Sequence, residues 1–397
     1  LPIFPAANKK TPHRAGLVVG LERGLAAAGF STFVISITLW HHARRTHVGD
    51  RELGKIKGLD GLRGIAVLFV IISHTVLWPY LGIESQKIMA LMNGHIGVSI
   101  FFVLSGFLIT LLLMRERDAT GTVDIVAFIK RRSLRIFPVY YLAIFLLMYM
   151  DATGKTNIPN CAYPYALTYT VNFIDKGCTH QTISHFWSLS VEEHFYIFWP
   201  FIFLLGRRFS LIIAATVAVA CVLVGTSLYS EVANRYPNRW TFPAMLPILA
   251  GCITAILHKA PAVKNLFTDS AKSNVMLVAI LAGLASPAFA NSEVIWLAAM
   301  SLLMLYIYYR QDSAVVRILE FKPLALIGLI SYGLYVWQGV FTGNGPYRSG
   351  SVFPPEMYTG LWLTFIIAPL SYVFFERPIM GFKKKFSWQN KTAAKAA

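Results

Sequence analysis

The sequence predicts an all-α, polytopic membrane protein with about ten transmembrane helices. Of its 397 residues, 56% are hydrophobic and only 14% are charged, whereas soluble domains carry roughly 25% charged residues. Apolar runs long enough to cross roughly 30 Å of hydrocarbon occur repeatedly along the chain. Basic residues gather between alternate runs, as they do at the cytoplasmic ends of membrane spans. These three observations exclude a soluble globular domain.

Ten apolar segments follow Gly58 and are the predicted spans. They lie at residues 62–81, 95–114, 134–151, 187–206, 209–229, 242–258, 274–290, 293–309, 323–342 and 358–376. Residues 56–378 are therefore the predicted transmembrane domain. We expect residues 1–55 to be an N-terminal segment with an interfacial helix or a lead-in, and residues 379–397 to be a basic cytoplasmic tail.

The loop charges predict that both chain ends face the cytoplasm. The loops on the predicted inner side hold most of the basic residues, among them Arg115, Arg117, Lys130, Arg131, Arg132, Arg135, Arg207, Arg208, Lys383, Lys384 and Lys385. This asymmetry is what orients membrane proteins. We therefore attribute the net charge of +17 to topology and to contact with membrane lipids, and we expect no nucleic-acid partner.

The four cysteines form neither a CxxC pair nor a zinc-ligand spacing, so we expect no metal site. Cys161 and Cys178 lie in the loop from residue 152 to residue 186, which the topology places outside. An oxidising compartment permits a disulfide there. Two interpretations stay open at this point, namely one disulfide or two unpaired thiols.

Ionisable side chains at membrane depth are costly and are therefore candidates for function. Arg63 and His74 are eleven residues apart in the first span, so a helix places them on nearly one face, roughly 16 Å apart along its axis. A histidine with a pKa near ~6.5 can act as a general base toward a hydroxyl. The alternatives are an orientation anchor for Arg63 and an interhelical hydrogen bond for His74.

Two further groups of charged residues enter apolar segments. Glu192 and Glu193 are adjacent, so they point to different faces of a helix, and either one could orient a histidine or bind a sugar hydroxyl. Arg132 and Arg135 share a helical face and could bind phosphate through two parallel hydrogen bonds. The alternatives are helix-start carboxylates favoured by the macrodipole and a topology signal with anionic-lipid contact.

In these segments the chain resembles the membrane acyltransferase-3 family, over roughly residues 58–378. The motifs that carry the resemblance are Arg63-x10-His74; Gly97-Val-Ser-Ile-Phe-Phe-Val-Leu-Ser-Gly-Phe-Leu-Ile109; Arg132-x-x-Arg135 before Pro138; Trp187-Ser-Leu-Ser-Val-Glu-Glu193 with Phe195 and Tyr196; Ser331-Tyr-Gly-Leu-Tyr-Val-Trp337; and Glu376-Arg-Pro378. Each motif alone is weak, but six in family order on a ten-span frame are specific.

The resemblance implies a ten-helix protein of the bacterial inner membrane that transfers an acetyl or other short acyl group from cytoplasmic acyl-CoA. The implied acceptor is a surface carbohydrate or a lipid-linked glycan, such as lipopolysaccharide O-antigen, exopolysaccharide or peptidoglycan, or a glycosylated small molecule. His74 is the expected catalytic histidine, as general base or acyl carrier, with Arg63 as its partner and Glu193 or Glu192 to orient it. Arg132, Arg135 and Arg63 are expected at the phosphates of acetyl-CoA, and Ser105 near the donor.

Two departures from the family pattern concern proton-holding residues: Gln338 and His194 stand where many relatives carry His and Gln. They leave the reaction type unchanged and put the acceptor in question. Because about twenty residues follow Arg377, we expect no second domain after it. A transporter or flippase of polysaccharide precursors is the alternative function, although such proteins more often show an internal repeat, which we do not find.

Overall fold

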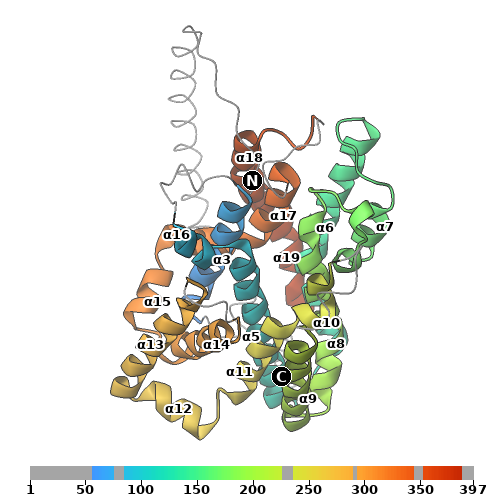
Figure 1. Cartoon of the computed structure of the whole chain (residues 1–397). Coiled ribbons are helices and arrows are strands. Elements are labelled where there is room, and N and C mark those ends of the chain that lie inside the picture. The colour runs from blue at the N-terminus through green and yellow to red at the C-terminus, as the bar shows by residue number, and fades with distance from the viewer. Residues whose placement is uncertain (1–55, 76–84, 226–235, 289–292, 344–351, 387–397) are drawn as a thin grey trace. The chain divides into compact units, whose positions relative to one another are not determined.

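The structure, a computed structural model, describes residues 56–75, 85–225, 236–288, 293–343 and 352–386 (Figure 1). Within these ranges the chain forms helices, turns and bends and no strand, so the predicted all-α class is confirmed. The helix or lead-in expected within residues 1–55 and the final tail residues 387–397 lie outside the described residues.

The helices follow the chain in the order labelled in Figure 1. The α-helices are α3 (Leu59–His74), α4 (Gln86–Leu91), α5 (Gly94–Thr120), α6 (Ile125–Ala152), α7 (Ala162–Leu167), α8 (Trp187–Leu204), α9 (Arg207–Gly225), α10 (Thr241–Ala244), α11 (Leu246–Leu257), α12 (Pro261–Thr268), α13 (Ser270–Leu284), α14 (Glu293–Tyr309), α15 (Ala314–Leu319), α16 (Lys322–Leu329), α17 (Ser331–Thr342), α18 (Met357–Ser371) and α19 (Arg377–Gly381). Short 3₁₀ or π turns are η2 (Val171–Phe173), η3 (Lys176–Cys178), η4 (Ser184–Phe186), η5 (Pro237–Arg239), η6 (Ser286–Ala288), η7 (Tyr372–Glu376) and η8 (Phe382–Phe386).

Three helical segments among the described residues are long and apolar enough to cross a membrane: Gln86–Thr120, Ile125–Ala152 and Met357–Gly381. The number rises to five if two bent helix pairs each count as one span, α11 with α12 and α16 with α17. Each predicted span coincides with a helix or a helix pair for at least most of its length. The count of ten spans and the orientation of the two ends stay predictions.

The predicted span 323–342 consists of two helices, because the helix is broken at Ile330. This residue leaves helical geometry, with φ −98° and ψ 10°, and α16 and α17 meet there at 68°. Helices broken at membrane depth commonly border binding sites, where neighbouring groups satisfy the freed backbone. The break makes Ser331 the first residue of α17.

The basic cluster Lys130–Arg135 is helical, because α6 begins nine residues before the predicted span. The side chain of Asp124 accepts a hydrogen bond from the backbone N–H of Ala127 at 2.9 Å and so caps the start of the helix. From there α6 continues without interruption through Pro138 to Ala152. Arg132 and Arg135 therefore project from one rigid helix, one turn apart.

Glycines allow the central helices to approach one another at backbone distance. A Cβ atom added to Gly106 of α5 would lie 1.9 Å from the carbonyl oxygen of Ile248 in α11, and one added to Gly251 of α11 would lie 2.2 Å from that of Val103. Small residues at such crossings let membrane helices pack closely. These glycine contacts hold α5 close to α11, and α5 also packs along α3 (Figure 1).

The segment between α6 and α8 is tied down by a covalent bond and by aromatic packing. Cys161 and Cys178 form a disulfide with their Cα atoms 5.5 Å apart, which decides between the two interpretations left open by the sequence. Tyr140 of α6 donates a hydrogen bond to the carbonyl of Ala166 at 2.7 Å, and its ring stacks on Tyr169 at 4.0 Å. These contacts hold the segment against the middle of α6.

Candidate active site

A cavity between α3, α5, α6, α8 and α17 gathers five of the predicted site residues. Arg63, Ser105, Arg132, Arg135 and Glu192 all line it. Its remaining walls are mainly aromatic and aliphatic, with a few hydroxyl groups: Val98, Phe101, Phe102, Leu108, Ile109, Ile136, Ser188, Leu189, Tyr196, Ser331, Tyr332 and Tyr335. Residues from distant parts of the chain therefore meet in one apolar chamber with a charged end.

The arginines give the cavity a positive end. Neither Arg132 nor Arg135 forms a hydrogen bond or an ion pair with any described residue. The guanidinium of Arg132 lies over the rings of Phe128 at 5.6 Å and Tyr196 at 5.7 Å. Aromatic faces attract a cation without consuming its hydrogen-bond donors. Both groups therefore keep their donors for an anion, as a phosphate-binding site requires.

Arg63 is held by a neighbour that sequence reasoning did not single out. Its Nη1 atom lies 3.0 Å from Oδ1 of Asp60, one turn earlier in α3. Both side chains are about one fifth exposed, at 21% and 20%. The spacing of three residues on a helix was a signal that could have predicted this pair. The pair fixes where the Arg63 guanidinium lies at the edge of the cavity.

Glu192 is the negative group in the cavity wall, and two hydroxyl groups hold its carboxylate. Ser105 donates a hydrogen bond to Oε1 at 2.8 Å, and Tyr196 donates to Oε2 at 3.2 Å. Tyr196 also lies 3.1 Å from the Ser105 oxygen. The sequence placed Tyr196 in a motif without giving it a role, although its spacing of four residues from Glu192 puts both on one helical face.

Glu193 is not among the residues that line the cavity, unlike its neighbour Glu192 on α8. It is buried, with 6% of its surface exposed, and its Oε1 atom has no hydrogen-bond partner in the part of the chain that the structure describes. The groups within electrostatic reach include the tyrosines Tyr140, Tyr169 and Tyr332. The structure therefore separates the two glutamates that the sequence treated as alternatives.

His74 ends α3 and lies outside the residues that line the cavity. Its Nδ1 atom is 2.7 Å from the carbonyl oxygen of Val70, one turn earlier. Because a carbonyl oxygen only accepts, we assign the Nδ1 proton to this hydrogen bond, which leaves the lone pair on Nε2. The group that orients the imidazole is thus a backbone carbonyl, where the sequence suggested a glutamate.

The cavity ends close to His74. A Cβ atom on Gly94, at the start of α5, would lie 3.3 Å from Cε1 of His74. Val98, which lines the cavity, is four residues further along the same helix, a rise of about 6 Å. The imidazole therefore lies about one helical turn beyond the uncharged end of the cavity, at the opposite end from the arginines.

Tyr335 and Ser188 form a hydroxyl pair in the cavity wall that the sequence did not predict as a site. Their oxygens are 2.6 Å apart, and Tyr335 donates to the carbonyl of His185 at 2.8 Å. Ser188 must therefore donate to Tyr335. Both residues lie inside recognised motifs, but only the packing of α17 against α8 brings them together.

The two residues that depart from the family pattern have polar partners away from the lining residues. The Nδ1 atom of His194 is 2.7 Å from Oγ1 of Thr241 in α10, so it joins two helices. Gln338 is fully buried, and its amide donates to Oγ1 of Thr342 at 2.9 Å. The His194 contact therefore joins α8 to α10, and the Gln338 contact lies within α17.

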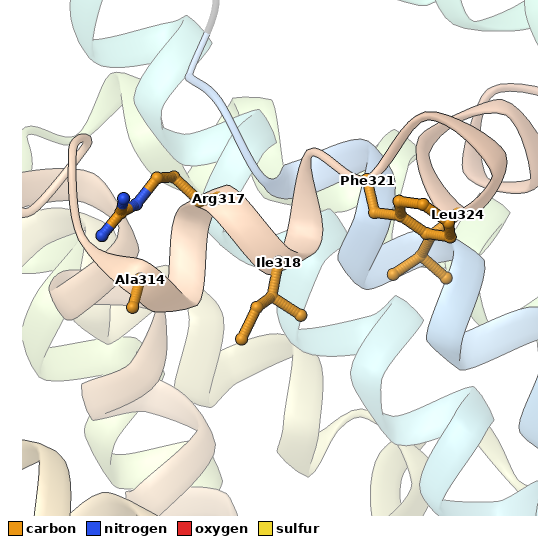
Figure 2. Close-up of a pocket in the computed structure, with 5 residues that line it drawn as sticks. All are labelled: Ala314, Arg317, Ile318, Phe321 and Leu324. Carbon is orange, nitrogen blue, oxygen red and sulfur yellow. The ribbon is translucent and has the colours of Figure 1, made fainter.

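A second depression lies on the surface of α15 and α16 (Figure 2). Its lining residues are Ala314, Arg317, Ile318, Phe321 and Leu324. In Figure 2 the side chains of Phe321 and Leu324 overlap at one end of the view, and Arg317 lies toward the other. Ile318 and Phe321 are 67% and 64% exposed. Arg317 is the one ionisable group among these five lining residues.

Comparison with known proteins agrees with the motifs. The family model Acyl_transf_3, described as an acyltransferase domain, matches residues 56–375. The chain is 27% identical to the peptidoglycan O-acetyltransferase OatA of Listeria monocytogenes, over 86% of this chain and 60% of that protein. It is 29% identical to the O-acetyltransferase OatA of Staphylococcus aureus, over 83% and 58%.

The chain thus spans about three fifths of the length of these relatives. No solved structure matches it. The family model covers the whole helical region that contains the cavity and both of its ends. The chain therefore belongs to the acyltransferase-3 family of membrane proteins.

Proposed function

We propose that this protein is a membrane O-acyltransferase that moves an acetyl or other short acyl group from cytoplasmic acyl-CoA to a hydroxyl of an extracytoplasmic carbohydrate. One observation carries the proposal: two arginines with no ion-pair partner among the described residues line one end of a cavity, and His74 lies about one helical turn beyond the other end. This arrangement suits a donor with a charged head and a reactive tip.

The donor would enter at the arginine end. Arg132 and Arg135 would hold its phosphates, and Arg63 would add a third positive charge. Along α5 the lining residues run from Ile109 to Val98, a rise of about 16 Å. An extended thioester arm would follow this apolar path, with its acyl group toward His74.

His74 would then activate the acceptor. Nε2 removes the proton of the acceptor hydroxyl while the hydroxyl oxygen attacks the thioester carbonyl carbon. A C–O bond forms, the C–S bond breaks, and the departing thiolate takes the proton from the imidazole. In the variant with an acyl-histidine intermediate, Nε2 itself attacks and later passes the acyl group to the hydroxyl. In both variants the Val70 carbonyl keeps the ring in the reactive tautomer.

For the acceptor we favour peptidoglycan, because the Listeria relative is named for that polymer. Lipopolysaccharide O-antigen, exopolysaccharide, other lipid-linked glycans and glycosylated small molecules are the alternatives. The proposed setting is the bacterial cytoplasmic membrane, with ten spans and both chain ends inside. In that orientation the arginines face the compartment that contains acyl-CoA.

The test is transfer of radiolabelled acetyl from acetyl-CoA by protein reconstituted in liposomes, with a peptidoglycan disaccharide as acceptor. We expect ester formation by the wild type. The rate of acetyl transfer by His74→Ala should be at least about 100-fold lower than that of the wild type, because a general base usually contributes a factor of this size. Arg132→Ala should raise the KM for acetyl-CoA by about 10-fold or more, because hydrogen bonds to charged groups contribute about 1.5–3 kcal/mol.

Two matched variants control for general damage. His95→Ala changes an exposed histidine next to Gly94, and Arg208→Ala changes an exposed arginine; both should transfer acetyl at the wild-type rate. If His74→Ala transfers at the wild-type rate, the proposed base is wrong. A wild-type protein that consumes no acetyl-CoA but moves a labelled glycan across the membrane would establish the transporter instead.

A further inference from the structure

Arg239 lies close to the His74 end of the cavity and has no role in the family motifs. It closes η5, the short turn that precedes α10. Its Nη1 atom donates a hydrogen bond to Oγ of Ser184 at 3.1 Å. The guanidinium lies 4.4 Å from the ring centre of Tyr236 and 5.8 Å from that of Trp187. Two aromatic faces and one hydroxyl therefore fix its position.

Two residues from separate helices locate Arg239 at the end of the cavity. It is within electrostatic range of the imidazole of His74, which ends α3, and of the phenol of Tyr335, which lines the cavity from α17. Trp187, over which it lies, packs edge-on against the lining residue Phe102. The guanidinium is thus near both the proposed base and the wall where the acyl group would lie.

Within the described part of the chain, the charge of Arg239 has no acidic partner. No described aspartate or glutamate forms an ion pair with it, and the residue is only partly exposed. A partly buried cation without a carboxylate partner is costly in a membrane protein and marks a functional position. Guanidinium groups carry five N–H donors, and the one described hydrogen bond, to Ser184, leaves others free to bind an oxygen.

We propose that Arg239 is a further catalytic residue, which stabilises the negative charge on the acyl carbonyl oxygen during transfer. This inference rests on the proposed function. As the acceptor oxygen adds to the carbonyl carbon, the C=O electron pair moves onto oxygen, and a guanidinium N–H donates to that oxyanion. When the C=O bond re-forms, the C–S bond breaks and the thiolate takes the proton from His74. Arg239 keeps its own proton throughout.

An arginine suits this position better than a lysine would. The planar guanidinium can lie between Tyr236 and Trp187 while its edge donates hydrogen bonds toward the cavity. Preorganised donors of this kind cost no reorganisation at the moment of reaction. Arg239→Lys keeps the charge and most of the side-chain length, so it separates the need for the planar donor group from the need for charge.

The experiment uses full-length protein in liposomes, acetyl-CoA, and a disaccharide of N-acetylglucosamine and N-acetylmuramic acid. For Arg239→Met we expect kcat to fall by about 100- to 1000-fold, the usual loss of one oxyanion donor, with the KM for acetyl-CoA changed by less than about 3-fold. The kcat of Arg239→Lys should lie between the kcat of Arg239→Met and that of the wild type. Added guanidinium should restore part of the activity of Arg239→Ala.

The matched control is Arg317→Met, which removes an exposed arginine of α15 (Figure 2) and should transfer at the wild-type rate. Retained binding of acetyl-CoA shows that each Arg239 variant is folded. If Arg239→Met or Arg239→Lys binds acetyl-CoA and keeps the wild-type kcat, the inference fails while the proposed function stands. A wild-type protein that transfers no acetyl group overturns both.

Discussion

Replacement of Gly328 by alanine tests whether backbone contact between α16 and α3 maintains the arginine end of the cavity. A Cβ atom at this position would lie 1.6 Å from the carbonyl oxygen of Asp60 and 3.0 Å from the backbone N of Gly64. Ordinary van der Waals contact begins at 3.4 Å. Because the opposing atoms are backbone, no side chain can rotate away, and the helices must separate by roughly 2 Å.

The expected cost follows from this geometry. Insertion of a methyl group into a packed region usually lowers the free energy of unfolding by about 1–3 kcal/mol. Because the added methyl group of Gly328→Ala would collide with backbone atoms, we expect a loss at the upper end of this range. A loss of about 3 kcal/mol changes the unfolding equilibrium by roughly 100-fold. Since Asp60 also forms the ion pair with Arg63, the shift should displace Arg63 and raise the KM for acetyl-CoA.

The assay is a thermal unfolding curve in detergent, together with acetyl-CoA kinetics in liposomes. Gly381→Ala is the matched control, because it also lies in a helix and a Cβ there would meet nothing within 4 Å. It should be neutral or slightly stabilising, since alanine is the better helix former. If Gly328→Ala unfolds at the same temperature as Gly381→Ala and keeps the wild-type KM, the close approach of α16 to α3 is refuted.

Two other predictions concern the cavity wall and the disulfide. Ser105→Ala removes the 2.8 Å hydrogen bond to Glu192. Because a hydrogen bond to a charged group contributes about 1.5–3 kcal/mol, kcat/KM should fall by about 10- to 100-fold. Ser105→Thr keeps the hydroxyl and should retain most of the activity, so equal activity in the two variants would contradict the role of the hydrogen bond. Cys161→Ser opens a cross-link between residues 17 apart and should cost about 3 kcal/mol, measured as a lower melting temperature. A reductant should lower the melting temperature of the wild type in the same way and leave that of Cys161→Ser unchanged.

Local patterns in the sequence predicted much of the site, because helical periodicity depends on near neighbours. The spacing of Arg132 and Arg135 predicted their shared face, and α6 presents both to the cavity. The adjacency of Glu192 and Glu193 predicted that they diverge. The order of six motifs indicated the family, and the match over residues 56–375 confirms it. The count of ten spans stays a prediction, because among the described residues three to five helical segments have the length and composition to cross a membrane.

Only the tertiary structure decided which groups meet. It selected Glu192 for the cavity, gave the His74 imidazole the Val70 carbonyl as its partner, and broke the helix at Ile330. It also placed Arg239, far along the chain, within electrostatic reach of His74. Such contacts depend on how helices distant in sequence pack, and glycine contacts such as Gly106 with Ile248 set that packing. The residue types and their helical faces were therefore readable from the sequence, whereas their partners across helices were decided by long-range packing.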